Sequence, residues 1–251
     1  MKALITGASS GIGADMARVM SSRGYDLILV ARRKSRLDKL KKELKTKVKV
    51  IDMDISSTFN CMKLYNQVKD EKIDVIINNA GFGVFGEFTE TNLNQELDMI
   101  DLNIKTVHTL TKLFVKDFKE RGTGYILNVA SSAAFLPGPL MASYYASKAY
   151  VLRLTEAVFK ELKKDNSRVY IGVLCPGPTE TEFNKIANVE FSLKSLNSYD
   201  VAQYAIKKMF AKKLVIIPGL VMKIGVFLTN FIPRFIKLDI AYQLQKRKFI
   251  K

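Results

Sequence analysis

The chain has 251 residues, of which 48% are hydrophobic and 25% charged, and its formal net charge is +16. These are the values of a globular protein, and the length suits one α/β domain. Two distant cysteines, Cys61 and Cys175, and a single histidine, His108, argue against a disulfide framework, a zinc site and a Ser-His-Asp triad, so we expect no metal.

The charge is unevenly placed along the sequence. Residues Lys207–Lys251 carry eleven Lys and Arg but one acid, Asp239. This excess indicates an anionic partner, such as a membrane surface or an acidic ligand, rather than nucleic acid. An ordinary solvated charged face is the alternative. The first predicted strand begins at Lys2 and leaves no room for a signal peptide, so we expect a cytoplasmic protein.

Apolar, β-branched runs alternate with helical patterns along the chain. The predicted strands are Lys2–Thr6, Asp26–Ala31, Val48–Asp52, Asp74–Ile77, Gly124–Ala130, Arg168–Cys175 and Lys213–Ile217. The predicted helices span 12–23, 34–45, 57–71, 92–121, 143–164 and 198–211. Such alternation is typical of a parallel sheet with helices on both faces. We expect one doubly wound α/β domain over 1–251, with a core over 1–217 and an apolar, basic helical extension over 218–251.

A glycine-rich turn joins the first strand to the first helix, where residues 4–13 read L-I-T-G-A-S-S-G-I-G. Small residues let a diphosphate approach the backbone, and the helix N-terminus offers it N–H groups. The spacing T-G-x-x-x-G-x-G resembles the short-chain dehydrogenase/reductase family. This resemblance implies a Rossmann-type fold of about seven parallel strands. It also implies that a nicotinamide dinucleotide binds at Gly7, Ser9, Ser10, Gly11, Ile12 and Gly13.

The residues after the second strand indicate which dinucleotide binds. An acidic residue there bonds a free ribose 2′-hydroxyl, whereas a basic one accommodates a 2′-phosphate. This chain has Arg32 and Arg33 followed by Lys34, with no carboxylate. Guanidinium groups match phosphate oxygens, so NADP(H) is favoured over NAD(H). An exposed basic helix start is the alternative reading.

Three further stretches resemble the family's cofactor site. Asp54 and Ile55 follow the third strand, where the family's Asp bonds the adenine, although a turn or helix cap is equally plausible. Asn79, Ala80 and Gly81 belong to an N-N-A-G match after the fourth strand. A P-G-x-x-x-T match after the sixth strand implies contact with the nicotinamide, although two prolines and a glycine also mark a simple turn. Its residues are Pro176, Gly177, Thr179 and Thr181.

Tyr144 and Lys148 lie four residues apart on a predicted helix and therefore share a face. A nearby ammonium is expected to lower the pKa of the tyrosine, which can then act as a general acid or base. Pairs at Tyr65, Tyr204 and Tyr242 have the same spacing, so context must decide.

The context favours Tyr144. Ser131 ends the fifth strand at the carboxyl edge of the sheet, where ligands bind in such folds. It precedes Tyr144 by thirteen residues, as the family's catalytic serine does, and Ser132 is the adjacent alternative. The stretch Tyr144–Lys148 resembles the family's Y-x-A-S-K.

Asn103 matches the asparagine that completes the family's Asn-Ser-Tyr-Lys tetrad. The resemblance implies that it holds a water linking Lys148 to solvent. Asn is a poor helix former, so a kink in the predicted helix would explain its place. Thr106 stands where the family has glycine, a small departure.

The tetrad implies carbonyl reduction by hydride transfer from NADPH, with Tyr144 as general acid/base. Two alternatives remain: a 3-oxoacyl or other lipid-carbonyl reductase at a membrane surface, and a non-catalytic NADP(H)-binding regulator. Apolar side chains in the loops predict a small apolar carbonyl or alcohol substrate, although core packing explains many of them equally well. They are Phe82, Phe85, Phe135, Leu136, Leu140, Met141, Phe183 and Phe191.

The C-terminal stretch Leu220–Ile236 is strongly apolar but interrupted by Lys223, Pro233 and Arg234. A transmembrane helix is therefore a poor reading. An amphipathic helix that lies on a membrane or caps the active site is the better one. The family resemblance also implies a homo-oligomer, whose usual C-terminal contact this tail could block or replace.

Overall fold

The computed structural model describes residues 1–183 and 195–246, and within them one parallel sheet carries the fold. Its strands are β1 (Lys2–Thr6), β2 (Asp26–Ala31), β3 (Val48–Asp52), β4 (Val75–Asn78), β5 (Tyr125–Val129), β6 (Tyr170–Leu174) and β7 (Val215–Ile216). Their order is β3-β2-β1-β4-β5-β6-β7, and every neighbouring pair is parallel. The predicted doubly wound α/β fold is confirmed.

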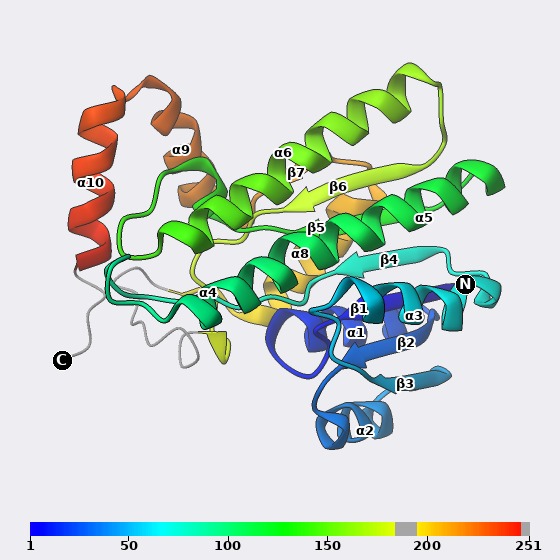
Figure 1. The fold of residues 1–251 in the computed structure, drawn as a ribbon. Helices are drawn as coiled ribbons and strands as arrows, with labels where there is room; N and C mark the ends of the chain where they lie inside the picture. The colour runs from blue at the N-terminus through cyan, green and yellow to red at the C-terminus, as the bar shows by residue number, and fades with distance from the viewer. Residues whose placement is uncertain (184–194, 247–251) are drawn as a thin grey trace.

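Helices cover both faces of the sheet (Figure 1). They are α1 (Gly11–Ser22), α2 (Lys34–Glu43), α3 (Thr58–Val68), α4 (Leu93–Ile100), α5 (Val107–Arg121), α6 (Ala142–Lys164) and α8 (Ser198–Phe210). Successive residues of a strand point to opposite faces. Ile5 accordingly packs into the core under α1, α2 and α8, and Leu4 into the core under α3 and α5. Both side chains are fully buried, which explains why the inner strands read as continuous apolar runs.

The predicted helix 92–121 is interrupted in the structure. A π-helix, η2 (Asp101–Thr106), lies between α4 and α5, so the chain makes one wide turn there. The predicted helix 57–71 likewise divides into α3 and a 3₁₀ turn, η1 (Lys69–Glu71). A further short 3₁₀ turn, η3 (Ser132–Phe135), follows β5.

The strand predicted over Lys213–Ile217 is shorter in the structure, where β7 has two residues. It lies at the edge of the sheet and pairs only with β6. An edge strand has one neighbour to define its ends, so its length follows less directly from its apolar run.

The C-terminal segment folds into two helices joined at Pro233. They are α9 (Leu220–Leu228) and α10 (Arg234–Lys246), with a 3₁₀ turn η4 (Thr229–Phe231) after α9. Figure 1 shows both helices beyond the carboxyl ends of β5 and β6. None of the helices in the described residues combines the length and apolar character that crossing a bilayer requires.

Candidate active site

A cavity of about 830 Å³ opens at the carboxyl edge of the sheet. Its volume is in the range of cofactor and small-molecule sites. Every predicted site residue belongs to the described part of the chain, and all of them except Asn103 line this cavity. Those in the wall are Gly7, Ser9, Ser10, Gly11, Ile12, Gly13, Arg32, Arg33, Asp54, Ile55, Asn79, Ala80, Gly81, Ser131, Tyr144, Lys148, Pro176, Gly177, Thr179 and Thr181.

The turn between β1 and α1 has room only for glycine at two positions, Gly7 and Gly13. Gly7 has a φ of +65°, and a Cβ at Gly13 would lie 2.4 Å from the carbonyl oxygen of Gly7. Asn79 holds the turn, because its Nδ2 donates to the carbonyl oxygens of Thr6 (3.1 Å) and Gly7 (3.2 Å). The first N–H groups of α1 have no partner inside the helix. This bare cradle fits the diphosphate of a dinucleotide.

Arg33 lies at the end of β2 and reaches the same turn. Its Nη2 donates to the hydroxyls of Ser10 (2.9 Å) and Ser9 (3.1 Å). Arg32 is more exposed, and its Nη1 lies 3.7 Å from a carboxylate oxygen of Asp54. Asp54 accepts the N–H of Ser56, so it forms a turn, while Ser57 caps α3.

Glu182 is a residue that the sequence reasoning missed. Its Oε2 accepts from Nη1 of Arg33 at 2.8 Å, and its Oε1 pairs with Arg36. Hydrogen bonds from Arg36 and then Arg33 lower the pKa of Glu182 to about 2. No local pattern marks this contact, because Glu182 follows β6 and the arginines follow β2.

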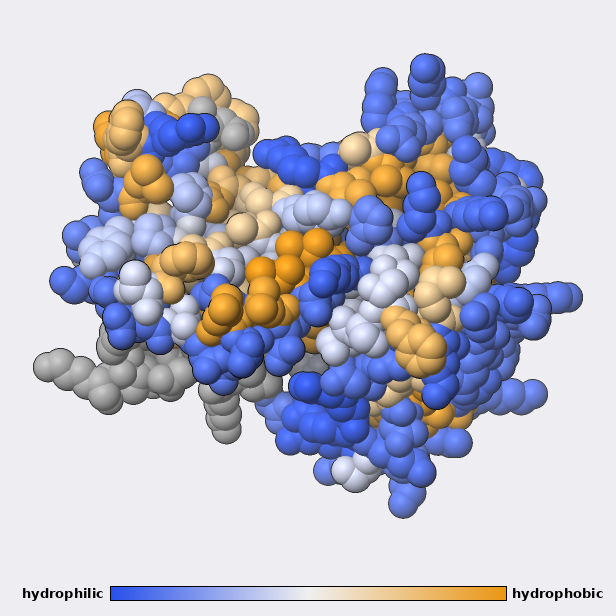
Figure 2. All heavy atoms as spheres, in the orientation of Figure 1, coloured by the Kyte–Doolittle hydropathy of each residue, from blue (hydrophilic) through white to orange (hydrophobic). Residues whose placement is uncertain are grey.

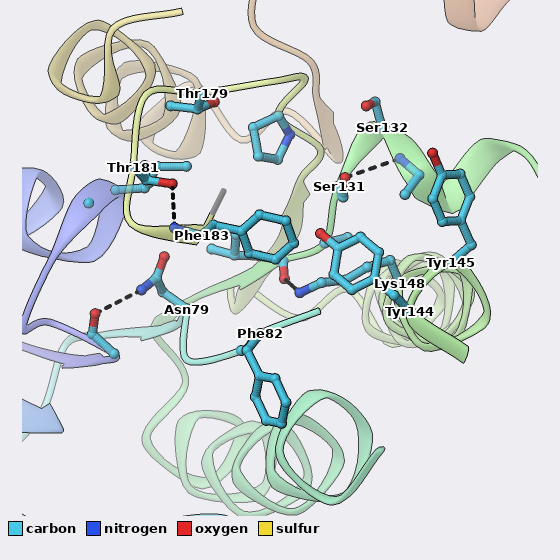
Figure 3. A pocket seen from close by; sticks show the side chains of 18 of the residues that line it. Asn79, Phe82, Ser131, Ser132, Tyr144, Tyr145, Lys148, Thr179, Thr181 and Phe183 are labelled. Atoms are coloured by element: carbon cyan, nitrogen blue, oxygen red, sulfur yellow. Dashed lines mark hydrogen bonds between the residues drawn. The ribbon is translucent and has the colours of Figure 1, made fainter. Parts of the chain in front are cut away.

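Ser131, Tyr144 and Lys148 come together on one wall of the cavity (Figure 3). The view shows the Tyr144 and Ser131 hydroxyls facing one another, while the Ser132 side chain points away. Ser131 Oγ also accepts the N–H of Ala133 at 3.1 Å. Nζ of Lys148 donates to the carbonyl of Val129 at 3.1 Å and lies 5.7 Å from the centre of the Tyr144 ring.

The electrostatics at Tyr144 differ from the sequence prediction. Burial raises the pKa of Tyr144 above its ordinary value, and the hydrogen bond with Ser131 offsets only part of that. The predicted lowering by Lys148 is therefore wrong for this arrangement, because the ammonium points at the Val129 carbonyl and is itself buried. Burial lowers the pKa of Lys148 to about 8.

Asn103 lies behind the cavity wall, in the wide turn η2, and is fully buried. Its Oδ1 accepts the N–H of Phe82 at 3.1 Å, and its Nδ2 donates to the Phe82 carbonyl at 2.9 Å and to Ser147 Oγ at 3.1 Å. A Cβ at Gly81 would lie 2.7 Å from Asn103 Oδ1 and 3.3 Å from Lys148 Nζ. The kink expected at Asn103 is thus present, and the asparagine and lysine approach the same small residue.

Two predicted threonines have contacts in the loop after β6. Thr179 Oγ1 donates to the carbonyl of Gly177 at 2.9 Å. Thr181 Oγ1 accepts the N–H of Phe183 at 3.2 Å, and its methyl group packs over Gly11. The loop therefore lies directly over the glycine turn.

The substrate end of the cavity is apolar. Of the predicted apolar loop residues in the described ranges, Phe85 and Leu140 do not line it. The residues that do are Phe82, Phe135, Leu136, Met141 and Phe183. Phe191 lies outside the described residues.

Helices α9 and α10 complete the wall. Their lining residues include Met222, Val226, Ile240, Leu244 and Gln245, and Ile232 lines the cavity from the link between them. Tyr145 also lines the cavity, and it bonds with Gln245 of α10. Of the two readings of the tail, capping the active site therefore has direct structural support.

A parallel sheet with a glycine cradle after its first strand, and a Ser beside a buried Tyr and Lys at the same edge, defines a dinucleotide-binding oxidoreductase. The model of the short chain dehydrogenase family matches residues 1–190. The chain therefore belongs to the short-chain dehydrogenase family, and it is an enzyme that acts on CH–OH or C=O groups with NAD(P).

Relatives and solved structures agree with this assignment. An uncharacterized oxidoreductase of Staphylococcus epidermidis is 33% identical over 211 residues, which cover 81% of this chain and 90% of the relative. A very-long-chain 3-oxoacyl-CoA reductase of Pyrenophora tritici-repentis is 34% identical over 196 residues, 73% of this chain and 56% of the relative.

Solved structures also match the chain over its whole length. The short-chain dehydrogenase of Sphingobium yanoikuyae in complex with NADPH has a TM-score of 0.82 and 30% identity, covering 100% of this chain and 96% of the other. The bulky-bulky ketone specific alcohol dehydrogenase of Comamonas testosteroni has a TM-score of 0.78 and 30% identity, covering 100% and 95%.

Proposed function

We propose that this enzyme reduces an apolar carbonyl compound with NADPH, and that Tyr144 gives the carbonyl oxygen its proton. The observation that carries the proposal is the facing pair of hydroxyls, Tyr144 and Ser131, on the wall of an apolar cavity that continues to the glycine cradle. The phenol, with its raised pKa, holds its proton at neutral pH, as a proton donor for reduction must.

Each residue of the site has a role in this chemistry. Ser131 donates a hydrogen bond to the substrate oxygen and orients it toward Tyr144. Lys148 holds the nicotinamide ribose, and Asn103 fixes the Phe82 backbone and the wide turn beside it. Negative charge that develops on the substrate oxygen is stabilised by the two hydroxyls in a site from which the apolar walls exclude water.

The residues present fit a bound NADPH. The cradle at Gly7 and Gly13 would hold its diphosphate, and Arg33 with Arg32 the 2′-phosphate. Asp54 and Ile55 would lie at the adenine, and Asn79 to Gly81 at the ribose. Pro176, Gly177, Thr179 and Thr181 would lie at the nicotinamide. When bound, the reduced dinucleotide supplies the hydrogen and electron pair that the carbonyl carbon gains.

The proposal is tested by NADPH consumption with a panel of medium- and long-chain 3-oxoacyl thioesters, bulky ketones and aldehydes. Tyr144→Phe should abolish turnover while NADPH still binds. Tyr150→Phe is the matched control, since Tyr150 lies on the same helix, is 37% exposed and bonds with His108. Tight NADPH binding without turnover of any compound would favour a non-catalytic regulator, and full activity of Tyr144→Phe would refute the site.

The outer face of α9 and α10 favours lipid carbonyls as substrates. Its apolar side chains are exposed, with Val221 at 83%, Phe231 at 70% and Phe235 at 81%. Lys223 and Arg234 lie among them, and Figure 2 shows hydrophobic and hydrophilic surface side by side over these helices. We propose that this C-terminal extension, which follows the core over 1–217, rests on an anionic membrane surface. Lipid substrates would then reach the cavity from the bilayer. The similarity to a very-long-chain 3-oxoacyl-CoA reductase supports the same substrate class.

Sedimentation with phosphatidylcholine vesicles, with and without phosphatidylglycerol, tests this surface. We expect binding that needs the anionic lipid and is lost in Phe227→Ser/Phe231→Ser. Phe59→Ser is the control, because Phe59 is 77% exposed on α3. If vesicles do not bind but the double variant changes the molecular mass in solution, the face belongs to a homo-oligomer instead.

A further inference from the structure

Glu182 links two parts of the cavity that are far apart in sequence. Its carboxylate pairs with Arg33 at 2.8 Å and with Arg36, from the start of α2. Arg33 is already engaged on its other side by Ser9 and Ser10. The guanidinium therefore joins the glycine turn, the end of β2 and the loop after β6 at one point.

Arg33 is one of the groups proposed above to hold the ribose 2′-phosphate, and Arg36 lies beside it on the same carboxylate. A carboxylate and a phosphate oxygen accept the same kind of N–H group, so the N–H of Arg33 Nη1 that Glu182 holds is not available to a phosphate. The Glu182 carboxylate is charged throughout the neutral range, since its arginine partners lower its pKa to about 2. The two arginines carry more positive charge than the Glu182 carboxylate neutralises. They therefore attract a phosphate dianion more strongly than they attract this monoanionic carboxylate.

The neighbours of Glu182 connect this contact to the substrate site. Thr181 packs over Gly11 of the turn, and Phe183 has its ring centre 5.3 Å from that of Tyr144. Figure 3 shows Phe183 beside Tyr144, with Thr181 on the side of the turn before α1. Three consecutive residues thus contact the diphosphate cradle, Arg33 and the catalytic tyrosine.

We propose that Glu182 is an internal counter-anion that the cofactor's 2′-phosphate displaces, and that its release shifts Phe183 from its present place beside Tyr144. The inference rests on the proposed NADP(H) preference. Glu182 then sets the affinity for phosphorylated dinucleotides, and substrate access to Tyr144 depends on which dinucleotide is bound.

Binding of adenosine 2′,5′-bisphosphate and of adenosine 5′-monophosphate, measured by calorimetry, tests the competition without any reaction. These probes differ by the 2′-phosphate alone. Glu182→Gln should increase the affinity for the bisphosphate about fivefold. The increase is modest because the ion pairs that Glu182 makes are partly exposed. The variant should leave the affinity for the monophosphate unchanged. Glu180→Gln, an exposed glutamate two residues earlier, should change neither affinity.

Weaker bisphosphate binding in Glu182→Gln would overturn the proposal, since Glu182 would then be positioning the arginines rather than competing. If the wild-type protein binds both probes equally but Glu182→Gln prefers the bisphosphate, the NADP(H) preference fails and the counter-anion stands. If neither protein discriminates, both fail.

The movement of Phe183 has its own readout. The chain contains no tryptophan, so Phe183→Trp places a single tryptophan, excited selectively at wavelengths that tyrosine hardly absorbs, beside Tyr144. Its emission should shift with the bisphosphate and not with the monophosphate. The shift should disappear in Phe183→Trp/Glu182→Gln. An equal response to both probes, or one that Glu182→Gln leaves intact, would refute the link between Glu182 and the catalytic tyrosine.

Discussion

The side-chain amide of Gln245 donates a hydrogen bond to the hydroxyl of Tyr145, joining α10 to the helix that carries Tyr144 and Lys148. Gln245 is 2% exposed, and within the described residues its Oε1 has no partner. This contact fixes the C-terminal helix against the active-site wall at the cost of one unsatisfied oxygen.

Tyr145→Phe should destabilise the protein by about 1–3 kcal/mol, because it leaves the buried amide of Gln245 without its partner. Tyr145→Phe/Gln245→Leu should recover most of that loss, since both polar groups are then replaced by apolar ones. Urea midpoints measure both effects, with Tyr242→Phe on α10 as an exposed control. A double variant less stable than either single one would contradict the pairing.

Gly13→Ala should prevent dinucleotide binding, because the new methyl group would lie 2.4 Å from the Gly7 carbonyl and from Asn79 Nδ2. Binding of NADPH by fluorescence titration checks this. Gly225→Ala is the matched control: it lies in α9 with no atom of the described structure within 4 Å of its added Cβ. It should keep full NADPH binding and gain up to about 1 kcal/mol of stability, since alanine is the better helix former.

Lys148→Met should raise the free energy of unfolding above that of the wild-type protein at pH 7, and the difference should be smaller at high pH. Burial lowers the pKa of Lys148 to about 8 from 10.5, so the unfolded chain binds this proton more tightly than the folded protein. The wild-type protein therefore gains stability as pH rises from about 8 to about 10.5, by about 3 kcal/mol as an upper value.

Urea unfolding at pH 7 and pH 10.5 measures the change. The advantage of Lys148→Met should shrink between the two, whereas Lys160→Met, on the exposed side of α6, should behave alike at both. A constant advantage for Lys148→Met would show that its ammonium is not destabilised in the folded protein.

Asn103→Ala should cost about 2 kcal/mol, because it removes the partners of the Phe82 N–H and carbonyl. It should also reduce turnover more than NADPH affinity, as Phe82 lines the substrate end of the cavity. Thermal melting and steady-state kinetics test both. Asn94→Ala, on the exposed face of α4, is the control; equal effects of the two variants would argue against a special role for Asn103.

The sheet could be predicted because its information is local. β1 and β2 match their predicted bounds, since each has an apolar run that begins after a charged residue and is followed by a glycine or a charged residue. The cavity residues followed from the same logic: parallel strands bring their carboxyl ends to one edge, so the motifs after β1, β4, β5 and β6 had to meet.

What escaped prediction depends on contacts between distant segments. Glu182 with Arg33, and Gln245 with Tyr145, are pairs of ordinary residues whose partners nothing nearby in sequence specifies. The pKa of Tyr144 was predicted in the wrong direction for a related reason. The spacing to Lys148 was visible, but neither the burial of both groups nor the Val129 carbonyl that takes the ammonium was.

The wide turn at Asp101–Thr106 makes the enzyme sensitive to chain length at one place. It contains one residue more than an ordinary helical turn, and each helical residue corresponds to a rotation of about 100°. This offset lets α4 present Met99 to the cluster around Tyr144 while α5 presents Phe114 to the sheet. A single-codon deletion here would restore a regular helix and rotate one of these faces out of place, although every motif would remain intact.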